Sequence, residues 1–169
     1  AGAAAHAWQL AWALSTFLLR RGLWSDHAAA CTAGLDAARR AGDSAGEAHA
    51  LLLLALGHLR SGRADAAAPR LRHALRLLET IGGSHRSQMT AHSSLLWIAE
   101  QQERYADMLS HAEQVFELSR AAGDQALEVM SLNDVGYAHA LRGNYRRAVS
   151  IRERALAGSQ EAGERCWES

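Results

Sequence analysis

Nine histidines and two cysteines are the side chains of this 169-residue sequence that could bind a metal ion or act as nucleophiles. The sequence has no His-Glu-x-x-His and no Cys-x-x-Cys motif, the spacings that bring metal ligands together. His85 and His92 are seven residues apart and could share one helix face, but no carboxylate or thiol is spaced to join them. We therefore predict no metal site and no cofactor.

The motifs of common catalytic sites are also absent from the sequence. There is no Gly-x-Ser-x-Gly motif, and because all 18 basic residues are arginine, no lysine can hold a phosphate in a Walker-type loop. Glu113 and Glu117 are spaced as two solvated neighbours on a helix surface rather than as an acid–base pair. Cys31 is expected to face the core as a structural thiol. We expect a protein without enzymatic activity.

The composition indicates an all-α protein of the cytoplasm. Hydrophobic residues make up 49% of the sequence, aromatic residues make up 6%, and there is one proline. Cys31 and Cys166 lie far apart, which fits reduced thiols better than a disulfide framework. Basic and acidic residues number 18 each, so we expect no direct contact with nucleic acid. The longest apolar runs, such as 50–56, are too short to cross a membrane.

The elements that position these residues follow from a repeat. Gly42, Gly82, Gly123 and Gly163 recur at intervals of 40, 41 and 40 residues, and each closes a helix-like stretch. A second break falls midway through each period, at 21–24, 61–64, 102–105 and 142–145. Both halves carry apolar residues at helical spacing, so each period predicts two antiparallel helices. The eight expected helices span 4–21, 25–41, 44–61, 65–81, 85–102, 105–122, 125–142 and 145–162.

Local signals predict how these helices begin and end. The closing glycines are expected to have positive φ or to follow the last helical turn directly. Asp43 and Ser44 stand where the third helix needs an N-cap, and Ser44 and Glu47 have the spacing of a capping box. Pro69 falls inside the fourth helix, so we expect that helix to start near residue 65 or 66, with the proline within or just after its first turn.

The residues around these breaks resemble the tetratricopeptide repeat (TPR). Its pattern has a small residue or a Leu-Gly pair in the first helix, glycine and an aromatic residue at the turn, and two alanines in the second helix. The fourth repeat carries it in Val135, Gly136, Gly143, Tyr145, Ala148 and Ala155, and the second in Leu54, Ala55, Gly62, Ala67 and Ala74. The usual period is 34 residues. The longer period is similar to that of actinobacterial antibiotic-regulatory (SARP-type) transcriptional regulators and maltose-regulator-like signalling ATPases.

This resemblance implies a right-handed superhelix, or α-solenoid, of four antiparallel helix hairpins. They span about 3–43, 44–83, 84–124 and 125–164. We expect residues 165–169 to begin a further helix of a larger protein. His58 and His139 occupy the repeat position where the family usually has tyrosine, so we expect two half-buried packing residues there. His27 and His73, in second helices, are expected to be ordinary packing or surface residues.

The resemblance also implies that the first helix of each hairpin lines a concave groove that binds a protein or peptide. By register, the groove residues are Gln9, Trp12, Thr16, Arg20, His49, Leu52, Leu56, Arg60, Ser93, Trp97, Gln101, Met130, Asn133 and Tyr137. Further positions of the same register are Leu19, Leu59, Thr90, Glu100 and Leu141. The leucines among them could instead pack against neighbouring helices.

The implied function is a non-catalytic scaffold for protein or peptide interaction, as the sensor or interaction domain of a bacterial transcriptional regulator in signal transduction. One alternative is a receptor domain that holds a small molecule or short peptide in the same groove. Another is a self-association module that forms a weak homo-oligomer through its groove or one end. The last helix offers Val149, Ala155 and Leu156 as apolar surface for such a contact.

Overall fold

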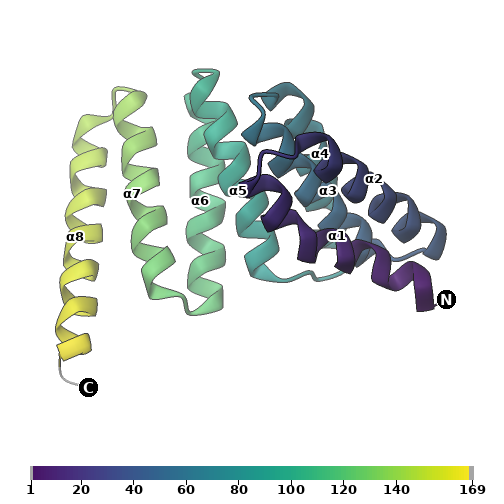
Figure 1. Cartoon of the computed structure of the whole chain (residues 1–169). Coiled ribbons are helices and arrows are strands. Elements are labelled where there is room, and N and C mark those ends of the chain that lie inside the picture. The colour runs from purple at the N-terminus through teal and green to yellow at the C-terminus, as the bar shows by residue number, and fades with distance from the viewer. Residues whose placement is uncertain (1, 168–169) are drawn as a thin grey trace. The chain divides into compact units, whose positions relative to one another are not determined.

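The computed structural model describes the backbone of residues 2–167 and the side chains of residues 9–11 and 13–160. Throughout these residues the chain forms helices joined by short turns, without a strand, which confirms the predicted all-α class (Figure 1). Every helix end except the last lies within two residues of its predicted position. The helices are α1 (Gly2–Arg20), α2 (Trp24–Ala41), α3 (Ser44–Arg60), α4 (Ala64–Thr80), α5 (His85–Gln101), α6 (Tyr105–Ala122), α7 (Gln125–Leu141) and α8 (Tyr145–Trp167).

Three of the predicted closing glycines have the left-handed backbone conformation. Gly42 ends α2 with φ 66°, Gly123 ends α6 with φ 68°, and Gly82 follows α4 with φ 61°. After two of these turns an aspartate caps the next helix. The carboxylates of Asp43 and Asp124 each accept a hydrogen bond from the backbone amide three residues further on, at 2.8 and 3.0 Å. Glycine and cap together fix both turns within a few residues of chain.

The predicted capping box at the start of α3 is wrong. Asp43 is the N-cap of α3, and Ser44 is the first residue of the helix. Glu47 instead accepts a hydrogen bond from Arg39 of α2 at 2.8 Å. Asp and Ser are about equally good N-caps, so the neighbouring aspartate can take the position and shift the frame by one residue.

The predicted break at Gly163 is also not found, because α8 continues to Trp167. Residues 165–167 therefore belong to α8 and do not begin a further helix, contrary to the prediction. Residues 168–169 lie outside the described part of the chain. Gly42 and Gly123 are each followed by a capping aspartate, whereas Gly163 is followed by Glu164, which is not a preferred N-cap. Glycine alone costs a helix only about 1 kcal/mol and does not end it.

Two residues occupy unusual places in the helical framework. The helix α4 begins at Ala64, so Pro69 lies just after the first turn, as predicted, and cannot donate the backbone hydrogen bond that another residue would make there. Glu103 has φ 55° in the α5–α6 turn. The equivalent turns use glycine, namely Gly22, Gly62 and Gly143, with φ of 70°, 73° and 77°.

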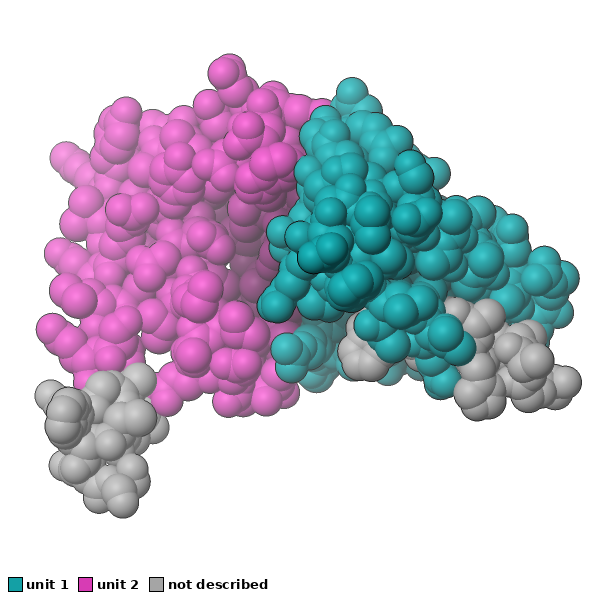
Figure 2. All heavy atoms as spheres, viewed as in Figure 1, with its two compact units in different colours: residues 1–87 teal, residues 88–169 magenta. Residues whose placement is uncertain are grey.

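The chain forms two compact units, residues 1–87 and residues 88–169 (Figure 2). In the first unit, Leu71 and Leu78 of α4 and Cys31 of α2 are buried to about 99% or more. His27 of α2 is also buried and lies directly against α3 at Gly57. A Cβ atom added to Gly57 would lie 2.6 Å from Nδ1 of His27, so the lack of a side chain at Gly57 is what makes room for the ring.

The second unit has one apolar core to which α5, α6, α7 and α8 all contribute. Its buried residues are Leu96, Ala99, Met108, Leu109, Ala112, Leu132, Val135, Ala138, Ile151 and Ala155. At Gly136 the helices α7 and α8 approach closely, since an added Cβ atom would lie 3.0 Å from Cγ of Arg152. This core fixes the rotation of α5 and α7 and therefore decides which of their side chains reach the surface.

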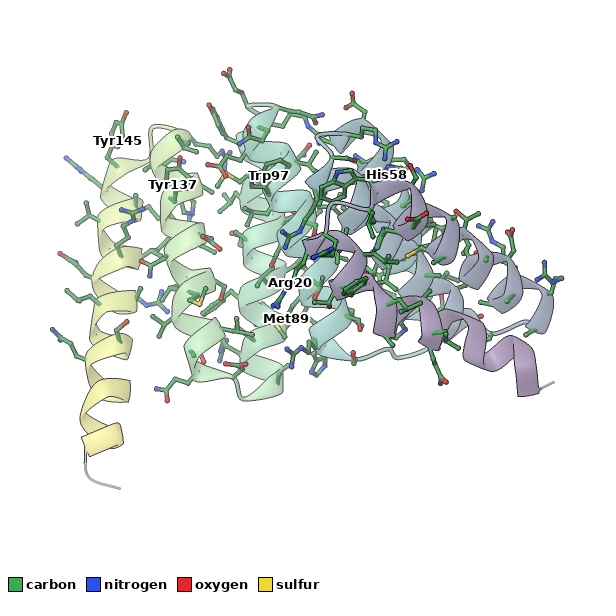
Figure 3. All side chains as sticks on the ribbon, viewed as in Figure 1. Arg20, His58, Met89, Trp97, Tyr137 and Tyr145 are labelled. Atoms are coloured by element: carbon green, nitrogen blue, oxygen red, sulfur yellow. The ribbon has the colours of Figure 1, made fainter. Side chains whose placement is uncertain are left out.

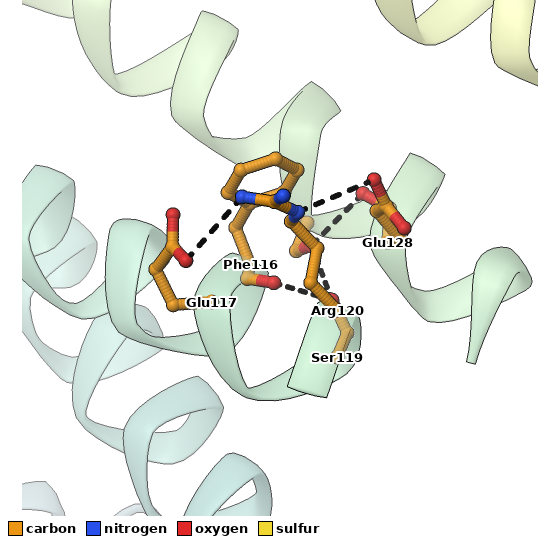
Figure 4. A network of polar contacts seen from close by, with 6 residues as sticks. Phe116, Glu117, Ser119, Arg120 and Glu128 are labelled. Carbon is orange, nitrogen blue, oxygen red and sulfur yellow. Dashed lines mark hydrogen bonds and ion pairs between the residues drawn. The ribbon is translucent and has the colours of Figure 1, made fainter. Parts of the chain in front are cut away.

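A polar network at the end of α6 holds the start of α7 (Figure 4). The guanidinium of Arg120 lies 3.6 Å from the carboxylate of Glu117 and 4.0 Å from that of Glu128 on α7, and 5.7 Å from the centre of the Phe116 ring. The hydroxyl of Ser119 donates to the backbone carbonyl of Phe116 at 2.8 Å. Exposed ion pairs contribute at most about 1 kcal/mol each, so this network orients the two helices more than it stabilises them.

Candidate functional site

The predicted groove residues of the first unit are divided between surface and core. Gln9, Thr16, Arg20 and Arg60 are exposed, and His49 and Leu56 are partly buried. Leu52 is only 6% exposed and belongs to the core, contrary to its prediction as a groove residue. The reason is that α3 is buried on most of its circumference, including every residue of 50–55. The side chain of Trp12 lies outside the described residues.

The predicted groove residues of the second unit all lie on the surface. They are Ser93, Trp97 and Gln101 of α5 and Met130, Asn133 and Tyr137 of α7. Three of them are large and apolar, with exposed fractions of 43% for Trp97, 62% for Met130 and 37% for Tyr137. Residues three or four apart share one face of a helix, so each helix presents its three residues together. Figure 3 labels Trp97 and Tyr137 on α5 and α7.

Two carboxylates lie on this surface, Glu100 of α5 and Asp134 of α7. Hydrogen bonding between the Tyr137 hydroxyl and the Glu100 carboxylate is the main cause of a raised pKa at Tyr137. Desolvation raises the pKa of Asp134, and the negative charge of Glu100 raises it further. Glu100 is therefore close to both residues of α7. Among the described residues, neither Glu100 nor Asp134 forms an ion pair.

These residues are exposed or half-buried on two helices that share the core of the second unit. We call this set the α5–α7 face, and it consists of Ser93, Trp97, Glu100, Gln101, Met130, Asn133, Asp134 and Tyr137. Sequence reasoning placed seven of these residues by their repeat register and missed Asp134. Its spacing gave a usable signal, because Asp134 is four residues after Met130 and three before Tyr137, on the same helix face.

Three histidines are packing residues whose charged form is disfavoured. Burial is the largest cause of a lowered pKa at His27, His58 and His139. His27 is fixed by a hydrogen bond of 2.8 Å between its Nε2 and the hydroxyl of Ser15. Neither ring nitrogen of His58 or His139 has a hydrogen-bond partner within the described part of the chain. His58 is half-buried and His139 is buried, which confirms both as packing residues.

His92 pairs with a histidine that sequence spacing did not suggest. Its partner is His111 of α6, with the two Nδ1 atoms 3.1 Å apart, while His85 is exposed at the start of α5. The pKa of His92 is lowered to about 4, mainly by burial and also by the charge of His111. At this distance one ring must donate and the other accept, so both cannot be protonated without losing the bond.

The remaining candidates for chemistry are inert or incomplete. Burial raises the pKa of the Cys31 thiol to about 11, so the reactive thiolate is scarce at neutral pH. No group of three or more His, Cys, Asp or Glu side chains that could hold a metal ion occurs among the described residues. An open hollow of about 550 Å³ at the α7–α8 turn is lined by Gly143, Asn144, Tyr145, Arg146 and Arg147.

Comparison with models of known protein families and with curated proteins gave no match. Of the described helices, none has the length and apolar character needed to cross a membrane. Among the described residues, the α5–α7 face is the strongest candidate for a functional surface.

Proposed function

We propose that this chain is a non-catalytic interaction module of tetratricopeptide type, and that the α5–α7 face binds a segment of a protein or peptide partner. The observation that carries the proposal is the exposure of Trp97, Met130 and Tyr137 on α5 and α7, two helices that share one core. Tryptophan and tyrosine dominate the energetics of protein interfaces, and large apolar side chains left exposed together are typical of interaction sites.

The polar residues of the face support the same proposal. Ser93, Gln101 and Asn133 are exposed beside the apolar side chains and offer both donors and acceptors. An extended peptide needs such groups, because its backbone amides and carbonyls lose their hydrogen bonds to water on binding. On the strength of the repeat resemblance, we propose the interaction domain of a bacterial transcriptional regulator as the setting in which the partner is recognised.

Selection from a displayed library of random dodecapeptides on the folded chain tests this function. Peptides that bind the wild-type chain should lose about thirtyfold in affinity on Trp97→Ala and on Tyr137→Ala, because each change removes a central aromatic anchor. Tyr145→Ala is the matched control, since Tyr145 is 69% exposed on α8 and lies outside the face. Circular dichroism verifies that all three variants keep their helicity.

Two results would contradict the proposal. One is that no peptide is enriched over the uncoated support. The other is that selected peptides bind Trp97→Ala and Tyr137→Ala as tightly as the wild-type chain, which would move the binding surface away from α5 and α7.

Self-association is a second candidate function, and one observation favours it. Tyr145, Val149 and Leu156 of α8 are 69%, 57% and 60% exposed at spacings of four and seven residues, which puts them along one helix face. Ala155, expected on this surface, is buried in the core instead. Sedimentation velocity over a hundredfold concentration range should reveal a reversible dimer that Leu156→Glu abolishes. A single monomeric species at all concentrations would eliminate this candidate.

A further inference from the structure

Charge on the α5–α7 face has one sign. Glu100 and Asp134 are its ionisable acids, and the face includes no arginine or histidine. The other members are neutral, and Trp97 and Tyr137 present aromatic rings whose faces attract cations. A surface of this kind is complementary to a segment that carries positive charge beside an apolar side chain.

Each carboxylate stands three residues from an exposed aromatic side chain of its own helix. Glu100 follows Trp97 by three residues on α5, and its carboxylate interacts with the Tyr137 hydroxyl of α7. Asp134 stands three residues before Tyr137, on the same side of α7, and feels the charge of Glu100. Two like charges in partly desolvated positions repel each other, and a cation placed between them removes that cost.

Arg152 of α8 is the cation of this chain that competes for the position. Its aliphatic part packs near Gly136, and its charge lowers the pKa of Tyr137. Yet Arg152 forms no ion pair with Glu100 or Asp134 within the described part of the chain. The chain thus leaves both carboxylates available to a partner.

We infer that the segment bound by the α5–α7 face carries a Lys or Arg side chain next to a large apolar side chain. The cation lies against Glu100 and Asp134, with the ring of Tyr137 beside it, and the apolar side chain packs on Trp97 and Met130. This inference rests on the proposed function and adds the chemical class of the partner, a cationic and apolar peptide segment.

The test uses the same dodecapeptide library, selected in parallel on the wild-type chain and on the double variant Glu100→Gln/Asp134→Asn. Wild-type selection should enrich peptides with Lys or Arg beside an aromatic or aliphatic residue. Those peptides should bind the double variant about tenfold more weakly, and added salt should weaken their binding to the wild-type chain, because partly exposed ion pairs contribute modestly and are screened. The matched control Glu113→Gln/Glu153→Gln removes two charges from exposed positions of α6 and α8 and should leave affinity unchanged.

The outcomes separate this inference from the function on which it rests. Peptides that lose affinity on Trp97→Ala but show no basic enrichment, or bind Glu100→Gln/Asp134→Asn as well as the wild-type chain, would overturn the cationic specificity and leave the interaction face intact. An equal loss in the control variant would assign the effect to net charge and overturn it too. Peptides indifferent to Trp97→Ala would overturn both proposals.

Discussion

Replacing His92 by asparagine should reduce the stability that this protein loses in mild acid. Burial and the neighbouring charge of His111 lower the pKa of His92 from 6.5 to about 4. The unfolded chain therefore binds a proton at His92 over a pH range in which the folded chain does not. The stability contributed by the neutral ring is fully present above pH 6.5, and it is lost as the pH falls from 6.5 toward 4.

The magnitude follows from the two pKa values. The full shift corresponds to about 3 kcal/mol of unfolding free energy, and a fall from pH 7 to pH 5 removes about 2 kcal/mol of it. Asparagine can place its amide close to the position of Nδ1 of His92. The variant His92→Asn therefore keeps a hydrogen bond to His111 but has no titrating side chain at residue 92.

Urea unfolding followed by circular dichroism at pH 7 and at pH 5 measures this difference. The wild-type chain should lose about 2 kcal/mol more than His92→Asn between the two pH values. His85→Asn is the matched control, since His85 lies exposed on the same helix, and it should behave like the wild-type chain. Equal losses in wild type and His92→Asn would refute the assignment of acid sensitivity to the buried pair.

Three substitutions test the backbone and packing arguments through the midpoint of thermal unfolding. Gly57→Ala should destabilise the first unit by about 1–3 kcal/mol, because its Cβ atom would lie 2.6 Å from the ring of His27. This loss is expected although alanine is the better helix former, and an unchanged midpoint would contradict the close fit. Glu103→Gly should stabilise the chain by about 1 kcal/mol, since glycine adopts the observed φ of 55° without strain, and a lower midpoint would show that the glutamate side chain matters more than the backbone. Pro69→Ala should stabilise α4 by about 2 kcal/mol by restoring one backbone hydrogen bond, and a loss of stability would mean that the proline ring packs usefully.

The sequence by itself determined the helical framework. Glycines with positive φ and aspartate caps act over four or five residues of chain, so Gly42 with Asp43 and Gly123 with Asp124 mark their turns wherever the helices later pack. The limit of such local signals is visible at Gly163, where the glycine is present without a capping aspartate and the helix continues. The register carried over from the repeat resemblance also indicated the surface side of α5 and α7, because the apolar residues that make their core are fixed in register with the exposed ones.

Only the tertiary structure decided which side chains meet. The interaction of Glu100 with Tyr137 and the hydrogen bond between His92 and His111 join residues 37 and 19 positions apart, on different helices. Such pairs depend on how far each helix is rotated about its axis, and one residue of rotation turns a side chain by about 100°. Leu52 shows the same dependence in reverse, because helical spacing alone allows it to line a surface, whereas the packing of α3 buries it. Local sequence sets where a helix begins and ends, and the close packing of the two cores sets which of its faces reaches solvent.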